Sequence, residues 1–505
     1  MRIGLIVDDG GVPRWVIETA RRIAATNRHD VRIMVQTPQG VASAPQRRPS
    51  LVALLALERQ LAGRARDWLS DPVDRAQSHA IPHADAAFVP DLVLRFDDLR
   101  HANAARTLTV LVDGAPVLAK LWAALLAGEA VSIAIHDSLT GEAATSALVA
   151  LEAPHRLLES ADAVLSHVVR STGDAALAVA EGRPVPAVAT DQVPLPSAPA
   201  GIGRSPRRFA ADRRASAVAR RRDERLGRAP AWQVGWRHVA ARSMPPQIIA
   251  PHTYATLRDD LQRYYADPFV IAHDGRMHMF VEELPYATGR GLISHVEIGA
   301  NGPLGTPHPV LEEPFHLSYP QVFADNGEIW MLPEAAASGR LTLYRAERFP
   351  DRWVRHAILI EEALHDATVF RHDGRWWMTA ATVVGSASAW DTLSLWYADR
   401  LEGPWRAHPM NPVLVDARSA RPAGVPFERN GALWRPAQDC RRGYGAALSL
   451  CRVTRLDAEV FAQQVAATSH HGQALAGSGP HTLNFAANGA SGVEVIDFFA
   501  PRAHV

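Results

Sequence analysis

Cysteine is scarce in this chain of 505 residues, and lysine is nearly absent. The two cysteines, Cys440 and Cys451, cannot build a disulfide scaffold or fill a four-ligand metal site. No His/Asp spacing typical of a metal site appears either, so no metal ligands are predicted. Lysine occurs at Lys120 alone, and arginine carries the rest of the positive charge. Because acidic and basic residues balance at a formal net charge of zero, no overall field favours nucleic acid as a partner.

Long apolar runs are also missing. No stretch of about 18 consecutive apolar residues is present, so we expect no transmembrane helix. The apolar residues within 1–7 are too few for the hydrophobic region of a signal peptide, and they meet the acidic pair Asp8-Asp9. We therefore expect a cytoplasmic protein.

The composition is that of a globular protein with more than one domain. Hydrophobic residues make up 47% of the chain and charged residues 21%, and 505 residues exceed one ordinary core. The residue pattern divides the chain into three parts. We predict an α/β domain over 1–190, a Pro/Arg-rich linker with a basic helix over 191–230, and an all-β domain over 231–505.

Residues 1–190 alternate between short buried strands and helical segments, which favours a mostly parallel sheet with helices on both faces. The strands are predicted over 2–7, 31–35, 92–96, 108–112 and 131–135, and the helices over 12–23, 51–69 and 116–127. No Gly-x-Gly-x-x-Gly follows the first strand, so a dinucleotide site is not supported and no cofactor is evident.

This first domain resembles the Rossmann-like amino-terminal fold of formyltransferases. The resemblance rests on the opening strand and helix, on the strand after Pro90-Asp91, and on the segment from Trp122 to the strand 131–135. In that family an Asn-x-His element and a later Asp hold the formyl donor and shuttle protons. Here the corresponding place is 108–114 and lacks that element, and the later acid survives only as Asp137. We interpret the domain as degenerate and silent for formyl transfer.

Between the two domains, prolines give way to arginines. The arginines of this segment are Arg204, Arg207, Arg208, Arg213, Arg214, Arg220, Arg221, Arg222, Arg225 and Arg228. One interpretation is a solvated helix between domains. The other is a basic surface over 204–228 that meets an anionic lipid head group, a pyrophosphate or a protein partner, which includes peripheral membrane contact.

The second domain repeats one β-hairpin pattern. An apolar run, an Asp-Gly or Asn-Gly turn and a second apolar run recur, with turn glycines at Gly275, Gly327, Gly374, Gly431 and Gly489. A repeat of roughly 50 residues with several short strands indicates a β-propeller, and five repeats indicate five blades. An irregular β-sandwich with similar turns is the alternative.

The repeats also carry a family resemblance over about 231–500. The blocks are Trp232-Gln233-Val234-Gly235-Trp236-Arg237, Ala266-Asp267-Pro268-Phe269, Ser318-Tyr319-Pro320-Gln321-Val322-Phe323, Leu332-Pro333-Glu334, Asp366-Ala367-Thr368-Val369-Phe370 and Arg435-Pro436-Ala437-Gln438-Asp439. Together they resemble the amino-terminal domain of glucosamine inositolphosphorylceramide transferases. More distantly, the pattern is similar to the five-bladed propellers of arabinanases, xylosidases, invertases and levansucrases.

Hairpin geometry predicts where the polar residues gather. The start of the first strand and the end of the second lie at one rim, so carboxylates there crowd one mouth of the channel. We predict Asp267, Glu334 and Asp366 as catalytic residues, because a ring of carboxylates suits sugar hydroxyls and an oxocarbenium-like transition state. The hydrolase relatives place an acid in each of the first three blades. Here the second position is Tyr319, and Glu334 is the substitute from the adjacent strand end.

A second set of residues is predicted to bind the substrate. It consists of Glu283, Tyr319, Gln321, Arg435, Asp439 and His481. Structural roles stand beside these assignments: Arg435 and Asp439 are also explained by an ion pair across the blade, and His481 by a hydrogen bond that closes a blade.

Three functions follow, with a sugar or glycoconjugate as the partner in the first two. The first is glycosyl transfer or hydrolysis at the propeller mouth, in surface polysaccharide or glycolipid synthesis. The second is a glycan-binding propeller without catalysis that assists a partner transferase. The third is a formyl- or acyl-type transferase acting through the amino-terminal domain.

Overall fold

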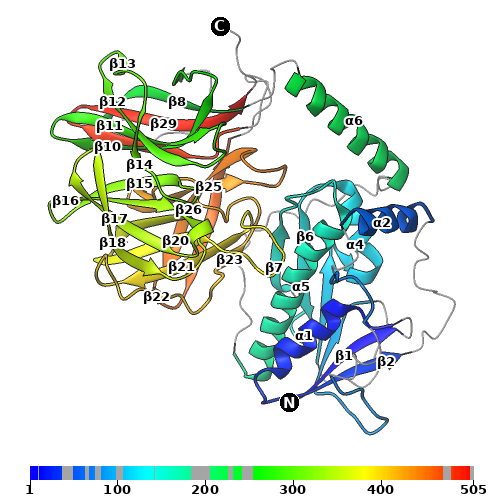
Figure 1. Ribbon diagram of the computed structural model, residues 1–505. Coiled ribbons are helices and arrows are strands. Elements are labelled where there is room, and N and C mark those ends of the chain that lie inside the picture. Colours follow the sequence, from blue (N-terminus) through cyan, green and yellow to red (C-terminus); the bar gives the residue numbers. More distant parts are fainter. Residues whose placement is uncertain are drawn as a thin grey trace. The chain divides into compact units, whose positions relative to one another are not determined.

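The computed structural model describes residues 1–8, 11–36, 49–62, 67–73, 81–97, 106–141, 143–183, 205–225, 231–241, 254–469 and 479–500. The chain forms two compact units, residues 1–219 with the loop 383–388 and residues 220–505 without that loop. Figure 1 labels the elements of both units, and each unit is described by itself. The linker segments 184–204 and 226–230, with Arg204 and Arg228, lie outside the described residues.

The first unit contains a mixed β-sheet with the strand order β2-β1-β3-β4-β6-β7, and β5 pairs with β4. Its strands are β1 (Arg2–Asp8), β2 (Asp30–Gln36), β3 (Leu92–Arg95), β4 (Arg106–Val112), β5 (Ala115–Pro116), β6 (Val131–Asp137) and β7 (Ala143–Val149). The first four long strands are parallel, as the strand–helix alternation predicted. Strands β6 and β7 are antiparallel, and β7 was not predicted.

Five helices are described, namely α1 (Arg14–Ala24), α2 (Pro49–Ala62), α4 (Val117–Ala127), α5 (Leu157–Ala180) and α6 (Pro206–Arg225). Helix α5 packs against α1, α2 and α4 and against the strands β3, β6 and β7. None of the helices in the described part of the chain combines the length and the apolar character that crossing a bilayer requires.

The predicted helix over 51–69 was too long at its end. Helix α2 stops at Ala62, and residues 67–73 are not helical. The carbonyl groups of Leu69 and Asp71 accept hydrogen bonds from the amides of Trp15 and Arg14 at the start of α1. This segment therefore satisfies the free amides of another helix, a tertiary role that local propensity does not reveal.

The second unit is a five-bladed β-propeller. Blade 1 contains β10 (Arg263–His273), β11 (Arg276–Pro285), β12 (Leu292–Gly299), β13 (Gly302–Pro303) and β14 (His308–Leu311), and blade 2 contains β15 (Ser318–Asp325), β16 (Glu328–Glu334), β17 (Leu341–Arg348) and β18 (Arg352–Ile360). Blade 3 contains β19 (His365–His372), β20 (Arg375–Ala381), β21 (Thr392–Ala398), β22 (Arg406–Ala407) and β23 (Leu414–Val415), and blade 4 contains β24 (Phe427–Arg429), β25 (Ala432–Asp439), β26 (Ala447–Leu456) and β27 (Phe461–Thr468). Blade 5 contains β28 (Leu483–Asn488), β29 (Ser491–Ala500), β8 (Ala231–Ala240) and β9 (Ala255–Thr256).

Blade 5 joins distant parts of the sequence. Strand β29 pairs antiparallel with β8 along the whole length of β8, from Ala240 opposite Ser491 to Ala231 opposite Ala500. Figure 1 shows β29 in red beside the green β8. This pairing closes the ring of blades, because the backbone N–H and C=O groups along the facing edges of β8 and β29 hydrogen-bond to each other.

The predicted hairpin turns connect the first two strands of blades 1 to 4. In each turn an Asp or Asn and the following Gly both have positive φ, for example Asp274 at 47° and Gly275 at 75°. Two consecutive left-handed residues define the type I′ turn, which matches the twist of the flanking strands. The prediction of five blades from these turns is confirmed.

The hydrophobic cores of the propeller lie between adjacent blades. Residues of blades 1 and 2 form one cluster, and blades 2 and 3 form another. Further clusters join blade 5 to blade 1 and blade 4 to blade 5. The inner strand β10 also contacts β15 and β28, the first strands of both neighbouring blades. The first strand of each blade is therefore the inner one.

Candidate functional site

The inner strands of blades 1, 2 and 3 carry the same backbone irregularity at the same point. The pairing register with the second strand shifts there, and one residue adopts a left-handed backbone. These residues are Asp267 (φ 49°), Tyr319 (φ 46°) and Asp366 (φ 50°). A non-glycine residue in this region costs about 1–3 kcal/mol, and such strain concentrates at functional sites. All three side chains are buried.

Carboxylates hold the amides of these strained residues. The amide of Asp267 donates to Asp497 Oδ2 at 2.9 Å, and the amide of Asp366 donates to Glu334 Oε2 at 3.1 Å. The amide of Tyr319 donates to Asp267 Oδ2 at 3.2 Å. Each hydrogen bond joins one blade to the next, so the starts of inner strands and the ends of second strands meet at one rim of the propeller.

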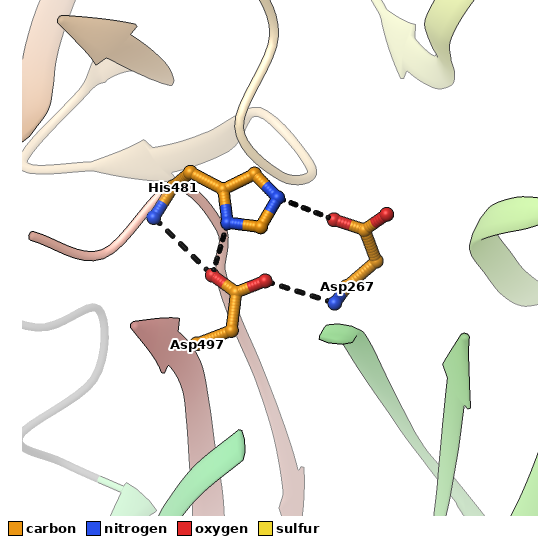
Figure 2. Close-up of side chains that lie close together, drawn as sticks. All are labelled: Asp267, His481 and Asp497. Carbon is orange, nitrogen blue, oxygen red and sulfur yellow. Dashed lines mark hydrogen bonds and ion pairs between the residues drawn. The ribbon is translucent and has the colours of Figure 1, made fainter. Parts of the chain in front are cut away.

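Asp267, His481 and Asp497 form a buried ion-pair cluster, which Figure 2 shows. His481 Nε2 lies 3.0 Å from Asp267 Oδ1, and His481 Nδ1 lies 2.8 Å from Asp497 Oδ1. Burial opposes a charged imidazole, but the two carboxylates outweigh it and raise the pKa of His481 to about 10. His481 is therefore an imidazolium ion at neutral pH.

Among the residues that the structure describes, these three side chains are also the group that could hold a metal ion, because their potential ligand atoms lie within 4.8 Å of one another. An imidazolium ion has no lone pair left for a metal. A proton on His481 and a metal between these side chains would therefore exclude each other.

Two further carboxylates occupy equivalent positions at the ends of second strands. Glu282 lies opposite Ala266 in blade 1, and Glu334 lies opposite Ser318 in blade 2. Each pairs with a histidine near the start of the next blade. His316, two residues before β15, has its Nε2 3.3 Å from Glu282 Oε1, and His365, the first residue of β19, has its Nδ1 3.3 Å from Glu334 Oε1.

The pKa values of these two carboxyl groups differ despite the shared arrangement. Burial raises the pKa of Glu282 to about 7, against the opposing hydrogen bond from His316. Burial also acts on Glu334, but the hydrogen bond from His365 and the charge of Arg421 together lower its pKa to about 2. Glu334 is therefore ionised at neutral pH, whereas Glu282 is partly protonated.

Asp366 contacts a buried arginine. Arg421 Nε donates to Asp366 Oδ2 at 2.6 Å, and Gln438 Nε2 donates to the same oxygen at 3.0 Å. The pKa of Asp366 is raised to about 7, first by burial and also by the nearby negative charge of Glu334. These two effects outweigh the positive charge of Arg421, which lowers the pKa. Carboxyl groups whose surroundings separate their pKa values are able to divide acid and base roles.

The predicted substrate-binding residues Glu283, Tyr319 and Gln321 bond to other groups of the propeller. Glu283 accepts hydrogen bonds from Arg263 and from Ser294 Oγ. The hydroxyl of Tyr319 lies 3.1 Å from Thr368 Oγ1. Gln321 bonds with both ends of its amide to the backbone of Val369, which joins the inner strands of blades 2 and 3.

Arg435 and Asp439 do not form the ion pair that was one explanation of their presence. The Arg435 guanidinium donates to the carbonyl groups of Ser419 and Ala420 and to Gln463, all within blade 4 and its preceding loop. Asp439 pairs instead with Arg441, the second residue after it. The side chains separate because Arg435 is in the middle of β25 and Asp439 is at its end.

Sequence reasoning missed the arginine that reaches the carboxylates. That arginine is Arg421, which comes from the loop before β24. A signal existed, since Arg421-Pro422-Ala423 repeats the tripeptide Arg435-Pro436-Ala437. The histidines His316 and His365 were missed as well, although His365 directly precedes the strained Asp366 and His316 lies three residues before the strained Tyr319.

Residues 249–485 match the family model described as "Glucosamine inositolphosphorylceramide transferase 1, N-terminal". Proteins named Glucosamine inositolphosphorylceramide transferase 1 from Arabidopsis thaliana and Oryza sativa subsp. japonica are both 34% identical over 205 residues. These residues are 39% of this chain and 26% or 27% of the relatives. The chain thus spans about a quarter of the curated relatives it matches.

Similar solved structures include glycoside hydrolases. The GH43_1 enzyme from Xanthomonas citri complexed with xylose is 13% identical with a TM-score of 0.35, covering 48% of this chain and 88% of that one. Zg3597, a family 117 glycoside hydrolase from Zobellia galactanivorans, is 14% identical with a TM-score of 0.32, covering 47% and 85%.

Proposed function

We propose that the propeller is a carbohydrate-active module that binds a sugar of a glycoconjugate at the carboxylate-lined rim and transfers or hydrolyses a glycosyl group there. One observation carries this proposal: acids from neighbouring blades converge on one rim, on residues held in strained backbone. The match of residues 249–485 to a family named for a glucosamine transferase to inositolphosphorylceramide supports a glycolipid as the substrate class.

The three catalytic residues divide the chemistry as follows. Glu334 stays ionised and stabilises positive charge that develops on the sugar ring. Asp366, with its pKa near neutrality, donates or accepts the proton of the glycosidic oxygen. Asp267, oriented by His481 and by the amide of Tyr319, is the base or nucleophile.

Isothermal titration of nucleotide sugars and short oligosaccharides tests the site. We expect binding to the wild type and at least tenfold weaker binding to Asp267→Asn, because the substitution removes a charge at the centre of the cluster. The matched control is Asp274→Asn, since Asp274 lies in an exposed hairpin turn where Asn fits equally well. Equal binding by wild type and Asp267→Asn would refute a site at this rim.

A glycan-binding propeller without catalysis is the second candidate. It is favoured by the fact that each predicted catalytic acid already has a partner of positive charge or a histidine: Asp267 has His481, Glu334 has His365 and Asp366 has Arg421. Turnover separates the two candidates. If Asp366→Asn binds a sugar as well as the wild type and neither protein converts it, the binding role stands alone.

The first unit offers little support for formyl transfer. Asp137, the surviving acid of that resemblance, is buried and accepts hydrogen bonds from Arg106 Nε at 3.0 Å and from the amide of Leu139. Its pKa is lowered chiefly by Arg106, so it is an ionised structural anchor rather than a proton carrier. The formyltransferase-like ancestry of this unit and a cytoplasmic location stay predictions.

Contact with a membrane surface is proposed for helix α6. Phe209 is buried and Arg213 pairs with Glu58, which anchors the helix, whereas Arg207, Arg208, Arg214, Arg220 and Arg221 are exposed. Exposed arginines on one helix attract anionic head groups. Sedimentation with vesicles tests this. We expect binding to vesicles with 30% phosphatidylserine and none to vesicles of pure phosphatidylcholine. Each arginine near the anionic surface should contribute about 1 kcal/mol to the binding free energy.

A further inference from the structure

Two aromatic side chains contact the cations that pair with Asp267 and Asp366, and a third packs against one of them; no role has been assigned to these rings. Trp232 comes from β8, Trp390 precedes β21, and Tyr444 lies in the loop between β25 and β26. All three are partly exposed. Tyr444 meets Trp232 edge-on at 5.8 Å between ring centres and lies 5.6 Å from Trp390 at an interplanar angle of 30°. We call these three rings the aromatic wall.

The aromatic wall covers the cations of the cluster. Trp232 lies over His481 with 4.0 Å between ring centres, and Tyr444 lies 5.1 Å from the same imidazole. The guanidinium of Arg421 lies 5.0 Å from the centre of the Tyr444 ring. Trp232 and Tyr444 therefore pack against His481 and Arg421, the two cations that pair with the carboxylates of Asp267 and Asp366.

Two glycines shape the loop that presents Tyr444. Gly443 has φ 123° and Gly445 has φ 62°, so both sides of Tyr444 adopt left-handed backbone. A Cβ on Gly445 would lie 2.3 Å from the ring of Trp232. Glycine is therefore required at 445 both for its left-handed backbone and for the missing Cβ, which lets the Trp232 ring approach the loop that carries Tyr444.

The Tyr444 hydroxyl adds a polar end to this surface. Within the described residues we find no hydrogen bond to that hydroxyl, and it is not among the buried polar atoms that lack a partner. Burial, and then the charges of Asp366, Asp267 and Glu334 against that of Arg421, raises the pKa of Tyr444, so the phenol stays neutral and can donate.

We propose that Trp232, Trp390 and Tyr444 form a stacking subsite for a pyranose ring whose hydroxyl groups reach the carboxylates of Asp267 and Asp366. A pyranose has an apolar face of axial C–H groups and a polar edge of hydroxyl groups. Aromatic faces beside carboxylates complement both. This subsite rests on the proposed function, because it places the same sugar that the rim binds.

The probe is methyl β-D-glucopyranoside, in which the axial hydrogens H1, H3 and H5 share one face. With the wild type we expect upfield shifts and the strongest saturation transfer for these protons in nuclear magnetic resonance. Tyr444→Leu should bind about 3- to 10-fold more weakly and lose the upfield shift, in line with the contribution of one aromatic contact. Tyr444→Phe keeps the ring and should retain both the shift and most of the affinity.

A second variant guards against a folding defect at one position. Gly445→Ala pushes the Trp232 ring away and should weaken the probe to a similar degree, with Gly431→Ala, in an open hairpin turn, as its control. Binding that survives both Tyr444→Leu and Gly445→Ala, yet fails in Asp267→Asn, would overturn the stacking subsite and leave the proposed function standing. Probe binding that is unchanged in all three variants would overturn both.

Discussion

The charge of His481 gives the sharpest prediction. Its pKa of about 10 in the folded protein lies above the 6.5 of an unfolded histidine. A base with a raised pKa stabilises the fold fully below pH 6.5, and this contribution is lost as the pH rises to 10. His481 is buried and its partners are buried carboxylates, so solvent screening is small. At about 1.36 kcal/mol per pH unit the whole contribution is roughly 5 kcal/mol.

The perturbation is His481→Gln, which keeps a hydrogen-bonding side chain and removes the titration. We expect the free energy of unfolding of the wild type, minus that of the variant, to fall by about 1.36 kcal/mol per pH unit between pH 7 and 9.5. Tryptophan fluorescence in urea reports on the propeller, because apart from Trp15, Trp68 and Trp122 all tryptophans lie at or beyond residue 231.

The control is His356→Gln, since His356 is an exposed histidine on β18 of the same propeller. It should leave the pH dependence unchanged. A difference between wild type and His481→Gln that stays constant from pH 7 to 9.5 would refute the assignment of His481 as a buried cation. It would reopen the Asp267 and Asp497 carboxylates as partners of a metal.

Three other perturbations follow from the same geometry. Gln321→Leu should destabilise the propeller by about 2–4 kcal/mol in urea unfolding, because it leaves both backbone groups of Val369 without partners; a loss below 0.5 kcal/mol would contradict this role. Burial, and then the charge of His278, lower the pKa of His295 to about 3, and a base with a lowered pKa makes the fold less stable as the pH falls. His295→Phe should therefore reduce the stability that the protein loses below pH 6.5. Thermal melts from pH 7 to 4 measure this. Gly424→Ala should abolish soluble expression, because its Cβ would lie 2.1 Å from a backbone oxygen and its φ is 137°; a normal melting temperature would contradict it.

The sequence predicted the propeller well because its signals are local. Asp-Gly and Asn-Gly turns need only two left-handed residues, and these pairs stand visibly between apolar runs. The closure of blade 5 by β8 was not predicted, because pairing between Ala240 and Ser491 leaves no trace in either segment alone. The antiparallel strand β7 was missed for a different reason: it pairs with its neighbour β6, but its sequence AATSALV is rich in alanine, which has a low strand propensity.

The candidate site was predicted only as a set of carboxylates. Their partners come from other blades or loops, as His481 does for Asp267 and Arg421 does for Asp366. Which cation meets which acid depends on side chains brought together by the closed ring, and spacing along the chain carries no information about that. The left-handed conformations of Asp267, Tyr319 and Asp366 were equally hidden, since none of these residues is glycine.

The closure of blade 5 also sets the order in which the propeller is completed. Strand β8 is synthesised before blades 1 to 4, yet its partner β29 comes after all of them. Until β29 arrives, β8 presents unpaired backbone groups, so the growing chain carries an open sheet edge through most of its synthesis. Contacts so distant in sequence form slowly, because loop closure costs entropy before they contribute. The Asp267–His481–Asp497 cluster, which spans this closure, is therefore assembled last.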